Sequence, residues 1–261
     1  MTRIDYVLIF IVGTMFGSFL NAYLWRVRAG RSVWKGRSMC TYCKNKINWF
    51  DNIPIISFFI LRAKCRSCKK PIFWQYPSVE LWMGLAFVFI AAHYPLVIDH
   101  WSLIITRWFI IWFLTLIFLY DLKYQEILNR FTLIPAGILF LIKIVFSLQS
   151  PVFFIALDML LGAFIASGFF LLQFTISKGK WIGGGDVRLG VFMGVILGWK
   201  LTILALLIAY ILGAVVGIIL LILAKKKQDS QIAFGTFLSV ATLIAMFWGE
   251  GILGWYLGLV M

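Results

Sequence analysis

Four cysteines form two Cys-x2-Cys pairs, and their spacing indicates a definite chemistry. Cys40 and Cys43 form one pair, Cys65 and Cys68 form the other, and 21 residues separate the pairs. This spacing is typical of paired zinc knuckles, in which four thiolates hold one Zn²⁺ in a tetrahedral shell. Such a closed shell leaves no position for a substrate, so the expected zinc is structural. The alternatives are two disulfides or four ordinary buried thiols.

Two aspartates at the ends of apolar segments form a second candidate site. Asp121 ends an apolar segment, within LIFLYDLKY, and Asp186 follows three glycines in WIGGGDVRLG. A carboxylate at the membrane boundary is costly, and two carboxyls that lie together can share a proton. One protonated and one ionised carboxyl are what an aspartyl protease uses to polarise a peptide carbonyl and to deprotonate the attacking water.

Each aspartate also has a structural explanation. Asp186 could cap the helix that follows it, and Asp121 could pair with Lys123 at the membrane surface. The glycines before Asp186 slightly favour catalysis, because a backbone without side chains lets a peptide approach closely. Four other polar residues are interpreted as structural, interfacial or loop residues: Asp158, Glu250, His93 and His100.

The elements that must position these residues are membrane-spanning helices. Of the 261 residues, 62% are hydrophobic, and the mean hydropathy is +0.97. A soluble domain has only about 45–50% apolar residues. Apolar runs of the length that a helix needs to cross the bilayer, about 20 residues, recur along the chain. We therefore expect an all-α polytopic membrane protein in the lipid bilayer. The first run is interpreted as a retained helix, because it lacks the basic start and cleavage site of a signal peptide.

The basic residues are concentrated in one segment. The net charge is +14, and twelve of the 24 Lys and Arg residues lie between Arg26 and Lys70, where Asp51 is the only acid. Because Lys and Arg favour the cytoplasmic side, this segment is predicted to be cytoplasmic and the N-terminus outside. The same bias explains the charge without nucleic acid, so no nucleic-acid partner is predicted. A reducing cytoplasm also disfavours disulfides between the cysteines.

The apolar runs predict about eight transmembrane helices and three regions. Residues 1–25 are the first transmembrane helix, residues 26–76 a cytoplasmic zinc domain with four cysteine ligands, and residues 77–261 a transmembrane domain that carries both aspartates at its cytoplasmic face. An insert of about 50 residues is near the lower limit for a core-stabilised fold, so a metal is expected in it. The predicted spans are about 6–25, 77–95, 101–120, 131–149, 152–176, 187–199, 201–224 and 234–258. Basic cytoplasmic turns are expected at 121–130, 177–188 and 225–231.

Short motifs occur in a fixed order along nearly the whole chain. They are GSFLNAYLWRV (17–27), GRSMCTYC (36–43), WFDNIPIISF (49–58), CRSC (65–68), QYPSVE (75–80), GGGD (183–186) and IAFGTFL (232–238). With them the chain resembles the bifunctional prepilin peptidases. The resemblance implies a GxGD-type intramembrane aspartyl protease of the bacterial inner membrane. It implies that the enzyme cuts the leader from type IV prepilins and pseudopilins and then methylates the new N-terminus with S-adenosylmethionine.

The resemblance places the protease pair at Asp121 and Asp186 and the zinc ligands at the four cysteines, the same six residues that the chemistry indicates. Two positions depart from the family pattern. Where the family usually has a Pro-Asp pair after the first aspartate, this chain has Leu128-Asn129, and the usual Lys two residues after the second is Arg188. The second change keeps the positive charge.

The methyl-transfer site implied by the resemblance lies in the cytoplasmic domain and the adjacent helix ends. No glycine-rich fingerprint for S-adenosylmethionine is visible. Asp51 and Glu80 are the acids that could bind a ribose there or accept a proton from the substrate amine. A salt bridge within the basic domain is the alternative for each.

Two other functions are considered. One is a transporter or channel whose intramembrane acids relay ions, with the zinc domain as a regulatory module. Against it, both aspartates lie at one face of the membrane. The other is a peptidase that lacks methyl transfer and keeps the zinc domain as a scaffold.

Overall fold

The computed structural model describes residues 3–33, 35–94, 101–146, 151–223 and 233–260. The chain divides into two compact units, residues 1–112 and 113–261, and the boundary falls within a helix. In the described part of the chain, β pairing is limited to two isolated bridges. The predicted basic turn at 225–231 and His100 lie outside the described residues.

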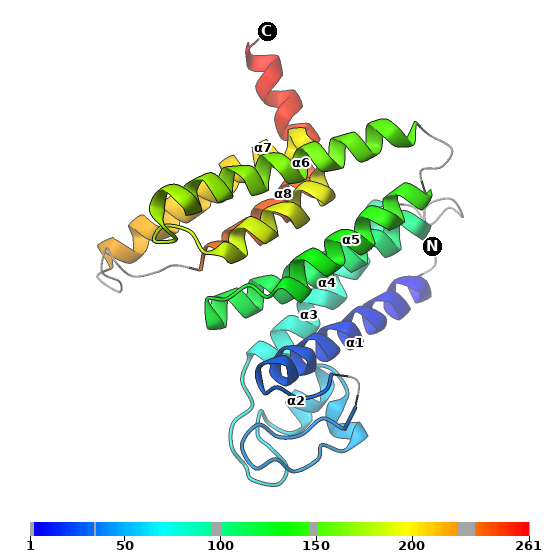
Figure 1. Cartoon of the computed structure of the whole chain (residues 1–261). Helices are drawn as coiled ribbons and strands as arrows, with labels where there is room; N and C mark the ends of the chain where they lie inside the picture. Colours follow the sequence, from blue (N-terminus) through cyan, green and yellow to red (C-terminus); the bar gives the residue numbers. More distant parts are fainter. Residues whose placement is uncertain (1–2, 34, 95–100, 147–150, 224–232, 261) are drawn as a thin grey trace. The chain divides into compact units, whose positions relative to one another are not determined.

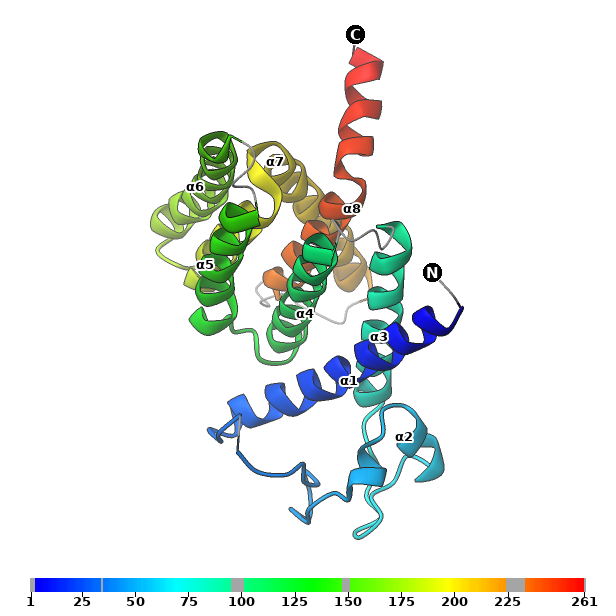
Figure 2. The same cartoon turned by 90° about the vertical axis from the view of Figure 1, so that its right-hand side faces the viewer.

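Seven of the described helices are long and apolar enough to cross a membrane, which confirms the prediction of an all-α, multi-pass membrane protein. They are α1 (Arg3–Arg28), α3 (Gln75–His93), α4 (Trp101–Tyr124), α5 (Asn129–Phe146), α6 (Val152–Ser177), α7 (Gly184–Ile222) and α8 (Phe234–Val260), shown in Figures 1 and 2. Many of their large apolar side chains are exposed, as expected of surfaces that face lipid.

The element α7 is not one continuous helix but two helical segments, which agrees with the predicted division of residues 187–224 at Lys200. The segments meet at a break at Gly198, where φ is 72° and ψ is 177°. Residues with a side chain rarely adopt this backbone conformation, so glycine suits the position. We call residues 184–197 the first arm of α7 and residues 199–222 the second arm.

The two arms of α7 run in opposite directions. The first arm runs antiparallel to α6, because residue numbers fall along the arm as they rise along α6. The second arm runs parallel to α6, because the numbers rise together. The pairs that lie together are Ala163 with Gly194 and Ala166 with Gly190 for the first arm, and Asp158 with Trp199 and Gln173 with Tyr210 for the second. The arms therefore correspond to the sixth and seventh predicted spans.

Helices α1 and α3 pack closely in the first unit because small residues line their contact. A Cβ added at Gly17 would lie 2.7 Å from the Cα of Glu80, and one added at Gly13 would lie 2.6 Å from the carbonyl oxygen of Met83. This is the small-xxx-small pattern by which membrane helices bring their backbones together. It places the start of α3, with Glu80, directly against α1.

The insert between α1 and α3, residues 29–74, holds two knuckles of the same backbone form. In the first, the N–H of Cys40 donates to the carbonyl of Asn45 at 2.9 Å. In the second, the N–H of Cys65 donates to the carbonyl of Lys70 at 2.9 Å. An isolated bridge closes each knuckle, Met39 with Lys46 and Lys64 with Pro71. The short helices η1 (Trp49–Asn52) and α2 (Ile56–Ile60) lie between the knuckles in sequence.

Candidate functional site

The two knuckles bring all four cysteines together, as their spacing predicts. The Sγ atoms lie within 4.8 Å of one another, and those of Cys40 and Cys68 are 3.9 Å apart. All four cysteines are free of disulfides and partly buried. Four thiols converging from two rigid hairpins can hold one metal ion in a closed shell of sulfur ligands.

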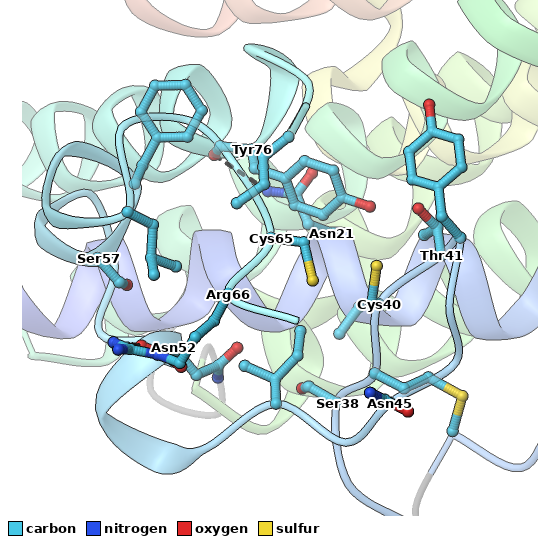
Figure 3. Close-up of a pocket in the computed structure, with 18 of the residues that line it drawn as sticks. Asn21, Ser38, Cys40, Thr41, Asn45, Asn52, Ser57, Cys65, Arg66 and Tyr76 are labelled. Atoms are coloured by element: carbon cyan, nitrogen blue, oxygen red, sulfur yellow. Dashed lines mark hydrogen bonds and ion pairs between the residues drawn. The ribbon is translucent and has the colours of Figure 1, made fainter. Parts of the chain in front are cut away.

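A cavity of about 190 Å³ lies beside these cysteines in the first unit. It is lined by the end of α1, both knuckles, the η1–α2 segment and the start of α3, and Figure 3 shows Cys40 and Cys65 at its wall. Asn21 of α1 donates to the carbonyl of Tyr76 at 3.2 Å across this wall. The cavity also contains Asp51 and Glu80 among its lining residues, so the structure brings both predicted acids to one place.

Asp51 is held in an ion pair with Arg66. The Arg66 Nε atom lies 2.8 Å from Oδ2 of Asp51, and a terminal guanidinium nitrogen lies 2.6 Å from Oδ1. These hydrogen bonds and the charge of Arg66 hold the pKa of the Asp51 carboxyl below its usual range. The salt-bridge alternative therefore describes Asp51, although the pair still forms part of the cavity wall.

Glu80 is held differently, by an uncharged donor. The side chain is 7% exposed, and the N–H of Ile55 donates to its Oε2 at 2.7 Å. Ser18 of α1 lines the same cavity. Ile55 reaches this position with φ 62° and ψ −55°, a conformation uncommon for a β-branched residue. Among the described residues Glu80 makes no ion pair, so its charge is not matched by a nearby cation there.

In the second unit, Asp121 lies one turn from the end of α4 and is 4% exposed. The backbone N–H of Thr236, at the start of α8, donates to its Oδ2 at 3.0 Å. This approach depends on Gly235, since a Cβ there would lie 2.8 Å from the same oxygen. Within the described residues Asp121 forms no ion pair with Lys123.

Asp186 is the third residue of α7 and is 7% exposed. The backbone N–H of Gly183 donates to its Oδ2 at 3.2 Å. The carboxyl thus closes the helix start in the manner of a capping box, so the predicted capping role is present. Capping through Oδ2 leaves Oδ1 with no hydrogen bond among the described residues.

Both aspartates line one cavity of about 860 Å³ in the second unit, and their carboxyls are close enough to interact electrostatically. The cavity lies among the ends of α4, α6, α7 and α8 and the loops beside them. Its other lining residues include Gln125, Glu126, Gln173, Lys180, Trp181, Arg188, Tyr210 and Phe234. The structure therefore brings together two residues that are 65 positions apart in the sequence.

Ile127 is a site residue that sequence reasoning missed. Its side chain occupies the space beside two glycines: a Cβ at Gly185 would lie 2.8 Å from Cβ of Ile127, and one at Gly235 would lie 2.6 Å from its Cδ1. Each glycine is next to a residue that forms the site, Asp186 in one case and Thr236 in the other. An apolar residue in a polar turn was the signal in the sequence.

The two departures from the family pattern meet in the structure. Arg188, on the first turns of α7, donates a hydrogen bond to the side-chain oxygen of Asn129 at the start of α5. The link ties α5 to the helix end that carries Asp186. It joins a cation to a neutral amide.

Comparisons with known proteins show the family of this chain. Residues 11–94 match the model of the bacterial peptidase A24 N-terminal domain, and residues 108–218 match that of the type IV leader peptidase family. A prepilin leader peptidase/N-methyltransferase of Legionella pneumophila is 34% identical over 227 residues, covering 85% of this chain and 76% of that protein. One of Aeromonas hydrophila is 30% identical over 283 residues, covering 96% and 93%. No solved structure matches this chain. The chain belongs to the prepilin leader peptidase/N-methyltransferase family.

Proposed function

We propose that this chain removes the leader peptide from type IV prepilins or pseudopilins with Asp121 and Asp186, and that it methylates the new N-terminus at the cavity of the first unit. The names of its relatives support both activities. The observation that carries the protease assignment is the pair of buried carboxyls, from two helices, that share one cavity.

In this mechanism the two carboxyls act as one acid and one base. The ionised carboxyl takes a proton from water, and the resulting hydroxide attacks the scissile carbonyl carbon. At the same time the protonated carboxyl donates its proton to the carbonyl oxygen. When the C–N bond breaks, the leaving amine receives a proton from the pair. The backbone N–H groups of Thr236 and Gly183 hold one oxygen of each carboxyl in place. The shared proton belongs to the pair rather than to either residue.

The depth of the site supports cleavage within the membrane. The first arm of α7, residues 184–197, is about 21 Å long at about 1.5 Å per residue, less than the hydrocarbon core of about 30 Å. If the break at Gly198 lies at one membrane surface, the other end of this arm, with Asp186, lies below the opposite surface. Basic residues at the helix ends around the aspartates support a cytoplasmic opening, under the positive-inside rule. They are Lys123, Arg130, Lys178, Lys180 and Arg188.

Zinc is the metal that the four-cysteine site fits. With Zn–S distances of about 2.3 Å, tetrahedral sulfurs are about 3.8 Å apart, close to the 3.9 Å between Cys40 and Cys68. Four thiolates occupy all positions of such an ion. Its role is therefore to hold the two knuckles together and to form the wall of the neighbouring cavity.

Glu80 is the better placed of the two acids for methyl transfer. S-adenosylmethionine supplies a methyl group on a positively charged sulfur, which a neutral amine attacks. The carboxyl of Glu80 lines the cavity and has no cationic partner among the described residues, whereas the rings of Trp25 and Tyr42 in the same wall already carry Arg31, Lys44 and Lys70. Asp51 is already neutralised by Arg66.

One assay separates the possible functions. Full-length protein in lipid is given a synthetic prepilin and S-adenosylmethionine with a labelled methyl group. We expect a cleaved and methylated product. Cleavage without methylation would support the peptidase-only alternative, and an untouched substrate would contradict the proposal. Glu80→Gln in the same assay should lower methylation and leave cleavage intact, whereas equal methylation by both proteins would remove Glu80 from the site.

A further inference from the structure

Two ionisable side chains meet the break in α7 from neighbouring helices. Lys143 of α5 donates from Nζ to the carbonyl oxygens of Val195 at 2.9 Å and of Ile196 at 2.8 Å. Asp158 of α6 accepts, at Oδ1, a hydrogen bond of 3.2 Å from the backbone N–H of Trp199. Both residues lie within helices that are long and apolar enough to cross a membrane, and ionisable residues in such helices commonly have a function.

Each charge matches the helix end that it meets. The end of the first arm presents carbonyl oxygens and the negative end of its dipole, and the start of the second arm presents N–H groups and the positive end. Lys143 supplies donors and a positive charge to the former, and Asp158 supplies an acceptor and a negative charge to the latter. The break leaves these backbone groups without partners in their own helix, and the two side chains supply partners for them.

Gly198 leaves the space that this arrangement needs. A Cβ at this residue would lie 2.0 Å from Oδ2 of Asp158, and its φ of 72° is unfavourable for residues with side chains. The Asp158 carboxyl therefore occupies the place of the missing side chain. The break is built from three residues of three helices.

The reversal at this break gives the protease cavity its shape. Asp186 begins the first arm, Tyr210 lies on the second arm, and both line the same cavity. In an unbroken helix these two residues, 24 positions apart, would be separated by about 36 Å. The opposite end of the first arm is tied to the start of α5 through Arg188 and Asn129, so α5 holds this arm at both ends.

We propose that Lys143 and Asp158 are positioning residues of the protease: by holding the two helix ends at Gly198, they fix the first arm and place Asp186 against Asp121. The inference rests on the proposed protease function. Neither residue touches the substrate in this scheme. Their effect on cleavage passes through the position of the first arm.

The test compares disruptive and conservative changes in full-length protein with a synthetic prepilin. Lys143→Met and Asp158→Leu remove the bonds at the break, and a displacement of about 1 Å at the reacting groups costs about 100-fold in rate, so we expect kcat to fall by about 10-fold or more. Lys143→Arg keeps a donor, and Asp158→Asn keeps the Oδ1 acceptor. Both should retain most of the native kcat. Lys200→Met is the matched control, since this lysine lies beside the break but contacts only the ring of Trp199 among the described residues.

A second readout separates misplacement from partial unfolding. Loss of folded enzyme lowers the rate by the same factor at every pH, whereas a displaced Asp186 changes the shape of the pH profile. The charged and titratable groups that share its cavity are Asp121, Glu126, Lys180, Arg188 and Tyr210. Three outcomes would overturn the inference. Lys143→Met and Asp158→Leu could keep the native kcat, the conservative variants could lose as much kcat as the disruptive ones, or the pH profile of the disruptive variants could keep its native shape. If native protein and Lys200→Met both fail to cleave, the proposed function itself is wrong.

Discussion

At the residue scale, Asp121 and Asp186 are both almost fully buried and line one cavity. Asp121→Asn or Asp186→Asn keeps the size of the side chain but removes the acid and base function. Because the two carboxyls act together, we expect each change to lower cleavage by about 10²–10⁴-fold or more. The measurement is the rate of prepilin cleavage, with helicity and metal content as checks of folding.

Glu250→Gln is the matched control for the aspartate pair, since it neutralises an exposed acid on α8 away from the cavity. It should cleave at the native rate. A well-folded Asp121→Asn or Asp186→Asn protein that still processes prepilin would refute the mechanism and favour the transporter alternative.

The Asp51–Arg66 ion pair predicts a pH dependence of the first unit. Its hydrogen bonds lower the pKa of Asp51, so the ionised form stabilises the fold. This contribution is complete above the unfolded pKa of about 3.9 and is lost as the pH falls through the lower folded pKa. Since Arg66 is largely exposed, the effect should be small.

Asp51→Asn should therefore increase hydrogen exchange in residues 49–66 at pH 7, and its difference from the native protein should narrow below a pH of about 4. If the native protein and Asp51→Asn exchange at the same rate at pH 7, the Asp51–Arg66 pair does not stabilise this segment.

At the element scale, α8 reaches Asp121 only because Gly235 has no side chain. A Cβ there would lie 2.6 Å from Cδ1 of Ile127 and 2.8 Å from Oδ2 of Asp121. Gly235→Ala should push the start of α8 away and weaken the bond from Thr236, with a loss of cleavage of about 100-fold. Gly251→Ala on the same helix is the control, since nothing lies within 4 Å of its added Cβ. Similar rates for both alanine variants would mean that α8 does not position Asp121.

At the scale of the whole molecule, the four-cysteine site and the aspartate pair lie in different compact units. We expect about one zinc per chain by metal analysis. Removing the metal, by chelation or by Cys65→Ser, should unfold the insert, because so small a segment depends on the ion for its fold. Methylation should be lost, and cleavage should decline much less.

This prediction is tested by measuring methylation and cleavage in the same Cys65→Ser protein. Cys65→Ser protein that methylates at the native rate would contradict a structural zinc, and loss of cleavage in equal proportion would contradict the independence of the two units. A preparation without metal in which Cys40 is disulfide-linked would exclude the zinc site.

Apolar runs, basic residues and Cys-x2-Cys pairs could be interpreted from the sequence because each is a local signal. A run of about 20 apolar residues predicts a spanning helix whatever its neighbours are, and the paired cysteines predicted the cluster that the knuckles form. Asp121 and Asp186 could be named as candidates from their place at the ends of such runs. The division of residues 187–224 into two spans likewise agrees with the two arms of α7, although only the structure located the break at Gly198.

Only the tertiary structure decided which of these candidates lie together and what holds them. It brought Asp121 and Asp186 to one cavity, paired Asp51 with Arg66 but left Glu80 without a cation among the described residues, and placed Ile127 between two glycines. It also joined Lys143 and Asp158 to the break at Gly198. These contacts join residues far apart in the chain, and they depend on helix packing, which no single segment of the sequence encodes.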